Sequence, residues 1–317
     1  MACVTKADVV ILDKEKSSEV FQSVVLAWGR REKDFIKFEP PERKLRPKHI
    51  EYGSREHALW ILACGHWSRS GQQANQAIGL VAQFAEKYPH FLDPLAKRSK
   101  RQWKEFIRYM LPTFPFNEAE KMRRLRHWLR TLEYLKFYGG DPRNIFHLIN
   151  LSGDIREEII DRLTDFPGVA HKIAQLTAQW FQEVDWPDES EFWDCFNKVP
   201  VSAIDIWLMR LVYQLGLVVE YTSEHRDRIG RPISDQIVEI CSEHGIDHRA
   251  LIQALWHIGA RICALARRKK EPKRGSWCGS HCPVSRFCIC IVPANEEKEG
   301  RGELCWSLAE RRMVLLI

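Results

Sequence analysis

Apolar residues recur at the spacing of an α-helix along most of this sequence, and no other feature limits the possible folds as strongly. The clearest periodic runs cover residues 55–88 and 117–136, and the second run stops at a Gly-Gly-Asp-Pro segment. No convincing alternating strand or Asn-Gly hairpin accompanies them. The sequence therefore predicts an all-α fold. Further helices are expected in two short pieces over 142–163, over 171–184, from about 205, over 233–244 and over 247–266.

Length and composition are those of a globular protein. The 317 residues suit one large domain or two intertwined ones, and the apolar fraction of 45% is ordinary. No run of eighteen apolar residues occurs, and the first residues lack a basic segment followed by an apolar one. We therefore expect neither a membrane span nor a signal peptide. Without such a signal, the ten cysteines favour metal binding over disulfides.

The net charge of +6 is modest, but the basic residues are clustered. Three clusters occupy residues 97–104, 121–130 and 267–274. Such clusters suit contact with phosphate groups, because binding releases the counterions condensed on a nucleic acid. They are equally compatible with solvated helix faces, and the sequence leaves both interpretations open.

A tight turn between two helices, within residues 163–174, carries the most chemistry. One helix ends, Pro167-Gly168 turns the chain, and a new helix begins while its first backbone N–H groups are still unpaired. Unpaired N–H groups at a helix start form an anion site that suits a DNA phosphate. Gly168 lets the backbone approach such a phosphate closely because it has no β-carbon.

Two ionisable residues near this turn are candidates for chemistry. Lys172 falls in the first turn of the second helix, where the helix dipole and partial burial would both disfavour the ammonium form. A neutral amine can attack a sugar carbon and form a Schiff base, although a plain surface lysine is the alternative. Asp205 stands just before an apolar helical run. It is either an N-cap or a carboxylate that stabilises positive charge on a sugar ring.

Residues 166–174 (FPGVAHKIA) resemble the LPGVGxKTA hairpin of the endonuclease III branch of the helix-hairpin-helix DNA glycosylases. Ala203-Ile204-Asp205 followed by Arg210 is similar to the VDTHxxRV segment of that family. The resemblance implies that Lys172 is the nucleophile of a bifunctional glycosylase and lyase, and that Asp205 is its essential carboxylate. The residues then expected to contact DNA are Pro167, Gly168, Val169, Ala170, His171, Arg210 and, in the base-wedging region, Arg69.

The chain departs from the family pattern at several points. Ala170 replaces the second glycine of the hairpin, and Trp207 replaces the histidine of the aspartate segment. The loop between the lysine and the aspartate is longer and holds WPDESEFW at 186–193. The wedge region includes His66 and Trp67, which are candidates to stack on a base. These differences leave the excised base open, with an oxidised pyrimidine as the default of the family and an alkylated or otherwise modified base as the alternative.

Four of the cysteines, Cys263, Cys278, Cys282 and Cys288, have the spacing C-x14-C-x3-C-x5-C. Thiolate ligands select zinc or iron–sulfur. The segments WHIGARIC and CPVSRFC, which contain the first and the last two of these cysteines, resemble the elements that hold the cluster of the family, although the first two gaps are longer here. The resemblance implies a [4Fe–4S] cluster rather than zinc. Cys290 could replace Cys288 as the last ligand.

The resemblance extends over residues 55–290 and implies a two-domain architecture. A six-helix barrel domain with the hairpin would cover 54–190, and an iron–sulfur domain would combine 1–53 with 191–293. A linker is expected at 39–42, and a tail over 294–317 with a flexible stretch at 294–302.

The resemblance implies that the protein is a monomeric DNA repair enzyme. It would flip a damaged base out of double-stranded DNA and cleave the N-glycosidic bond, in the prokaryotic cytoplasm or the eukaryotic nucleus. A monofunctional glycosylase and a non-catalytic DNA-binding protein of the same fold are the alternatives.

Overall fold

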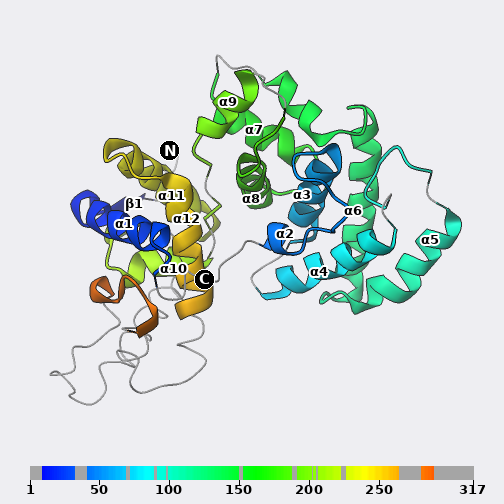
Figure 1. Ribbon diagram of the computed structural model, residues 1–317. Helices are drawn as coiled ribbons and strands as arrows, with labels where there is room; N and C mark the ends of the chain where they lie inside the picture. The colour runs from blue at the N-terminus through cyan, green and yellow to red at the C-terminus, as the bar shows by residue number, and fades with distance from the viewer. Residues whose placement is uncertain are drawn as a thin grey trace, which may run out of the picture. The chain divides into compact units, whose positions relative to one another are not determined.

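The computed structural model describes residues 9–32, 41–68, 72–88, 91–97, 99–149, 153–187, 191–201, 203–204, 206–222, 226–263 and 280–288. These residues are mostly helical, which confirms the expected fold class at that level (Figure 1). None of the helices in these ranges is long and apolar enough to cross a membrane.

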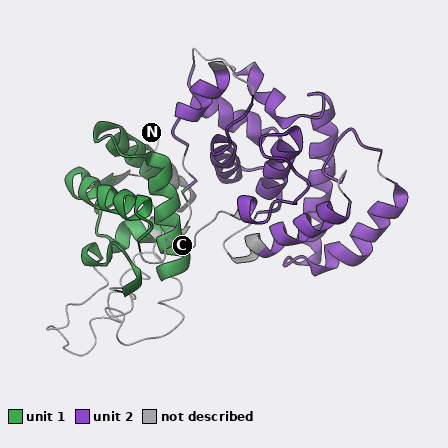
Figure 2. Ribbon diagram, in the orientation of Figure 1, with its two compact units in different colours: residues 1–38, 204–317 green, residues 39–203 purple. Residues whose placement is uncertain are grey.

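The chain forms two compact units, which we call the hairpin unit (residues 39–203) and the cysteine unit (residues 1–38 and 204–317) (Figure 2). The helices of the hairpin unit are α2 (Pro41–Lys44), α3 (Arg55–Trp67), α4 (Gln72–Lys87), α5 (Lys100–Glu105), α6 (Glu118–Lys136), α7 (Ile155–Thr164), α8 (His171–Gln182) and α9 (Glu191–Lys198). A short π-helix lies at Phe106–Met110, and short 3-10 helices lie at Leu111–Thr113 and Pro142–Leu148. The cysteine unit contains β1 (Val9–Leu12), α1 (Lys14–Gly29), α10 (Ile206–Gln214), β2 (Val218–Thr222), α11 (Arg226–Glu243), α12 (His248–His257) and turns at Ile258–Cys263 and Ser285–Phe287.

Two short helices explain where the units divide. The division lies at residues 39 and 203, whereas the sequence suggested 54 and 190. Helix α2 belongs to the hairpin unit because Trp60 donates its indole N–H to the backbone oxygen of Glu42, at 2.7 Å. Helix α9 belongs there because its aromatic side chains are buried in that core. The linker expected at 39–42 is therefore wrong for its second half, which begins a helix; residues 294–302 lie outside the described residues.

Helix α3 is the centre of the hairpin unit. Ser54 caps it by accepting a hydrogen bond from the backbone N–H of His57 at 3.1 Å, and every residue from His57 to Trp67 is buried. A helix that is buried on all sides needs other helices around it, and α4, α6 and α8 all contact α3.

Helix α8 crosses α3 at Gly65. A β-carbon on Gly65 would collide with the hydroxyl oxygen of Thr177, which itself donates a hydrogen bond to the backbone oxygen of Ile173 at 2.8 Å. The missing β-carbon thus allows the two helices to approach closely. Because α8 begins directly after the predicted hairpin turn, this contact also helps to set the position of that turn.

The long insertion that the sequence indicates after Lys172 is part of the core. Phe192, on α9, stacks with Phe146 at a ring-centroid distance of 6.0 Å, and both rings are buried. The side-chain amide of Gln182 donates to the backbone oxygens of Phe196 and Val199, at 2.6 and 2.7 Å. These contacts hold the insertion against the end of α8, so its described residues have a structural role.

The cysteine unit contains one feature that the sequence did not predict, a two-stranded antiparallel sheet. Strand β1 pairs with β2, with Val9 opposite Thr222 and Ile11 opposite Glu220. The sequence showed no convincing alternating strand, and this short pair is an addition to a fold that remains mostly helical. Local patterns cannot reveal such a pair, because the strands are short and far apart in the sequence with no hairpin turn between them.

We predict that Gly65→Ala destabilises the protein by about 1–3 kcal/mol, because the added methyl forces α3 and α8 apart. Gly79→Ala in α4 is the matched control, since its β-carbon would meet only Leu45 Cδ1 at 4.0 Å. It should be neutral or stabilising by less than about 1 kcal/mol. Urea unfolding measures both, and the double variant with Thr177→Ala should recover part of the loss. Equal stability of the two single variants would contradict this account of the crossing.

Candidate functional site

The predicted hairpin turn is present between α7 and α8. Phe166 and Val169 are buried and anchor the turn, and the backbone N–H of Val169 donates to the oxygen of Phe166 at 3.0 Å. Gly168 has φ +83°, a conformation that side chains with a β-carbon rarely adopt. The sequence prediction of a tight Pro-Gly turn is therefore confirmed.

The turn packs against helix α6. The ring of Tyr134 meets that of Phe166 nearly at right angles, with centroids 5.3 Å apart. Two helical turns before Tyr134, His127 lies with its imidazole against Gly168. A β-carbon on Gly168 would overlap that ring. The glycine is thus needed for close approach to a side chain of this chain, in addition to any approach to phosphate.

The start of α8 lacks a side-chain cap. Ala170 is the N-cap residue, and its backbone oxygen accepts from the N–H groups of Ile173 and Ala174, at 2.8 and 3.0 Å. No side chain among the described residues caps this end. Its first-turn N–H groups therefore keep the character of an anion site, as the sequence indicates.

The predicted DNA-contacting residues of the turn differ in exposure. Gly168, Ala170 and His171 are exposed, and Pro167 is half-buried. Val169 is buried in the core, so its side chain cannot touch a ligand at the surface. Its backbone N–H already donates to the oxygen of Phe166, so Val169 serves mainly to anchor the turn.

Lys172 occupies the second position of α8, and its side chain is exposed. The partial burial expected from the sequence is therefore wrong. Asp205 and Arg69 lie outside the described residues, as does the side chain of Arg210. Lys172 belongs to the hairpin unit and Asp205 to the sequence range of the cysteine unit.

His66 and Trp67, the candidates to stack on a base, are both buried in the core. His66 Nε2 lies 3.0 Å from the backbone oxygen of Arg124, whose guanidinium donates to the backbone oxygen of His66 at 2.8 Å. Burial lowers the pKa of His66 to about 3, so the ring is neutral at physiological pH. His66 joins α3 to α6, and Trp67 packs on Phe114 in the core with ring centroids 4.7 Å apart, so their expected role in stacking is wrong.

The basic cluster over 121–130 divides into two groups along α6. Lys121 and Arg124 are used internally: the first donates to the backbone oxygen of Pro112 at 2.8 Å, and the second binds Glu120 at 2.7 Å. Arg126 and Arg130 are exposed, and neither forms an ion pair within the described parts of the chain. Only the second group is therefore open to an external anion.

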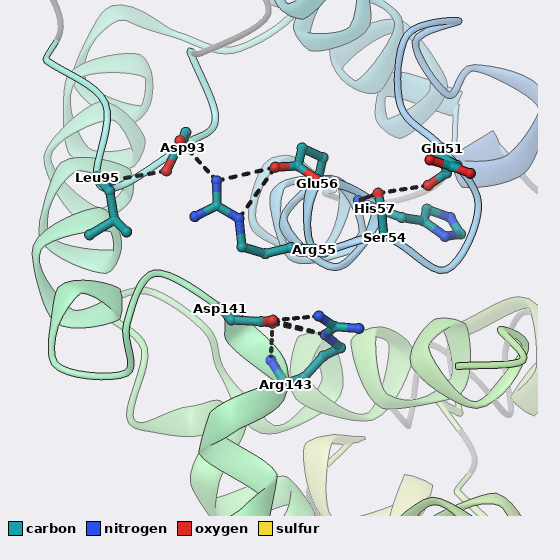
Figure 3. Close-up of polar contacts among 9 residues, drawn as sticks. All are labelled: Glu51, Ser54, Arg55, Glu56, His57, Asp93, Leu95, Asp141 and Arg143. Carbon is teal, nitrogen blue, oxygen red and sulfur yellow. Dashed lines mark hydrogen bonds and ion pairs between the residues drawn. The ribbon is translucent and has the colours of Figure 1, made fainter. Parts of the chain in front are cut away.

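A polar network that the sequence did not reveal holds the start of α3 (Figure 3). Arg55 binds Asp93 at 2.9 Å, and Arg143 binds Asp141 at 2.6 Å. The Arg143 guanidinium also lies over the ring of Trp186, 5.4 Å from its centroid. The contact ties the insertion to the rest of the hairpin unit, so the network positions the core and shows no feature of an active site.

Three of the four predicted metal ligands are described, and all three lie at the core of the cysteine unit. Cys282 is buried in that core, and Cys263 and Cys288 pack against it. The turn at Ser285–Phe287 holds the last two, because the N–H of Ser285 donates to the oxygen of Cys282 at 3.4 Å and that of Cys288 to the oxygen of Ser285 at 3.1 Å.

The cysteines suit a soft metal by their chemistry. None of the three forms a disulfide with another described cysteine. Cys278 lies outside the described residues, and among the described ones no three His, Cys, Asp or Glu side chains lie close enough together to hold a metal ion. Thiols from two separate segments on one core match the donor type of zinc or iron–sulfur centres.

Comparison with known proteins finds no family model, no curated protein and no solved structure that matches this chain. The residues and their geometry therefore carry the functional inference.

We predict that Gly168→Ala destabilises the protein by at least about 1 kcal/mol more than Gly139→Ala does. Both glycines have positive φ, +83° and +65°, so both variants carry the backbone strain. Only at Gly168 does the new methyl also overlap His127; at Gly139 it meets Asn144 Nδ2 at 3.8 Å. Thermal unfolding compares the two, and equal losses would show that the His127 contact has no energetic weight.

Proposed function

We propose that this protein is a DNA glycosylase of the helix-hairpin-helix type, which removes a damaged or modified base from double-stranded DNA. The observation that carries the proposal is the hairpin turn itself. A glycine with positive φ precedes a helix whose start has no side-chain cap, and Lys172 is exposed in the first turn of that helix. This arrangement suits a phosphate held by backbone N–H groups with an amine nearby.

The proposed reaction uses the neutral amine of Lys172. Its Nζ attacks C1′ of the flipped nucleotide, the bond from C1′ to the base breaks, and the base leaves with a proton. Opening of the sugar ring produces a Schiff base, from which β-elimination cleaves the strand on the 3′ side. The Asp205 carboxylate stabilises the positive charge that develops on the sugar.

The exposure of Lys172 favours a second candidate, a monofunctional glycosylase. An exposed amine is well solvated, and nothing within the described residues singles it out as a nucleophile. In this version Lys172 contacts DNA only, and a water activated near Asp205 attacks C1′. Both versions use the same hairpin.

We further propose that Cys263, Cys278, Cys282 and Cys288 hold a [4Fe–4S] cluster, with zinc as the alternative metal. The chemistry of the three described cysteines supports this, since all three are thiols in or against one core and come from two segments. A bound cluster would cross-link these segments and stabilise the cysteine unit. Arg286, two residues before the last cysteine, is exposed and donates to the Ser23 hydroxyl of α1 at 3.1 Å, which joins the cysteine segment to α1.

The first test is borohydride trapping on a duplex with an abasic site. The wild-type protein should form a covalent adduct, because borohydride reduces the Schiff base, and Lys172→Gln should form none. Lys198→Gln, the same substitution at an exposed lysine at the end of α9, is the matched control and should still be trapped. Base release retained by Lys172→Gln would instead support the monofunctional version.

The same assay, with duplexes carrying different lesions, tests the proposal as a whole. Asp205→Asn should lower base release by roughly 10²–10³-fold, since one charge-stabilising group is lost. A wild-type protein that releases no base from any lesion, while it still binds DNA, would leave only the non-catalytic alternative.

The second test is metal content. We predict that the purified protein contains iron and sulfide, and that Cys282→Ser loses most of both because one thiolate ligand is removed. Cys241→Ser is the control: Cys241 is buried in the same core but stands outside the predicted ligand set, so this variant should keep its iron. Zinc without iron would support the alternative metal, and neither metal would contradict the site.

A further inference from the structure

His127 lies beside the hairpin turn although no sequence motif includes it. It comes from α6, and its ring packs against Gly168 of the turn. Of the ring atoms, Nδ1 lies nearest to the position that a β-carbon of Gly168 would take, so Nε2 is farther from the turn. The residue is half-buried, which leaves part of it accessible from solvent.

The charges around His127 are mostly positive. Partial burial lowers the pKa of His127, and Arg123, Arg130 and Arg126 lower it further. Glu120 acts in the opposite direction, but its carboxylate already binds Arg124 at 2.7 Å and also pairs with Arg123. This group of cations repels a further positive charge and attracts an anion.

Among the other elements near His127, α7 ends at its C-cap residue Asp165, an exposed carboxylate next to the turn that acts on Tyr134 of α6. From α3 comes His66, which burial keeps neutral. The turn residues Phe166 to Ala170 contain no ionisable side chain, and the first turn of α8 adds His171 and Lys172, both exposed. Within the described residues, an anion arriving at this place therefore meets mainly positive and neutral groups, and the carboxylates of Glu120 and Asp165 oppose it.

We propose that the anion site of the hairpin is two-sided, and that His127, Arg126 and Arg130 of α6 form its second side and bind the same stretch of DNA backbone as the turn. This inference rests on the proposed function, because it assigns the DNA contact of the same site. His127 takes up a proton when the phosphate arrives, since the negative charge offsets the repulsion by the three arginines. The imidazolium then donates a charge-assisted hydrogen bond to the phosphate.

The sign of the pH effect follows from this proton uptake. In the free protein His127 is neutral near pH 7, because its pKa lies below the ordinary value of 6.5. In the complex the phosphate raises that pKa. DNA therefore binds more tightly as the pH falls, over the range between the pKa in the complex and the lower pKa in the free protein.

The test measures the Kd of the protein for a duplex with a stable abasic-site analogue, from pH 8 to pH 6 at constant ionic strength. The affinity of the wild type should rise about three- to tenfold per pH unit within that range, because one linked proton gives at most tenfold. His127→Gln should lose most of this dependence while it still binds at pH 8. His244→Gln, at an exposed histidine just after α11, is the control and should retain it. His171→Gln tests the other histidine of the site.

Calorimetry in buffers of different ionisation enthalpy gives an independent readout on the wild type. Uptake of a substantial fraction of one proton near pH 6.5 supports the proposal, and its absence overturns it even if His127→Gln is misfolded. A pH dependence that is unchanged in His127→Gln, or that disappears in His171→Gln, also overturns it and leaves the proposed glycosylase intact. If the wild type binds no DNA at any pH, the proposed function and this inference are both wrong.

Discussion

The packing of α3 against α8 is the contact on which the rest of the hairpin unit depends. Helix α3 is buried on every side, and α8 reaches it only because Gly65 has no β-carbon opposite Thr177. Helix α8 in turn begins at the hairpin turn, so its position against α3 decides where the uncapped N–H groups point. A second close approach, that of His127 to Gly168, fixes the turn against α6. The missing β-carbons of Gly65 and Gly168 thus allow the two close contacts that link the centre of the core to the proposed DNA site.

In the hairpin turn, buried residues hold the backbone in place and exposed residues are available to a ligand. Phe166 and Val169 are buried and hold the turn, whereas Gly168, His171 and Lys172 are exposed beside it. A site on rigid elements can hold a phosphate without reordering the backbone. The exposure of Lys172 also means that its proposed nucleophilic role depends on surroundings that the bound DNA must supply. For this reason the trapping experiment separates the two versions of the mechanism more directly than any measurement on the free protein.

The insertion between Lys172 and Asp205 shows how tertiary packing changes the meaning of a segment. From the sequence it is a long, aromatic-rich departure from the family pattern that leaves the excised base open. In the structure Phe192 stacks on Phe146 and Trp186 lies under Arg143, so these aromatic residues complete the core. The same is true of His66 and Trp67, because both are buried in the core, where His66 contacts α6 and Trp67 packs on Phe114. In each case a side chain that could serve a ligand is already used by the protein itself.

The sequence alone determined the features that depend on local chemistry. Helical periodicity predicted α3, α4, α6 and α8, and the Pro-Gly pair predicted the turn, because these signals act over a few neighbouring residues. The cysteine spacing likewise selected residues of which the three described lie at one core. Only the tertiary structure decided what depends on distant partners. It paired β1 with β2 across the whole chain, buried the insertion, exposed Lys172 and placed His127 against Gly168. These features depend on packing between residues that are far apart in the sequence, and a local sequence pattern does not indicate which distant surface a side chain will contact.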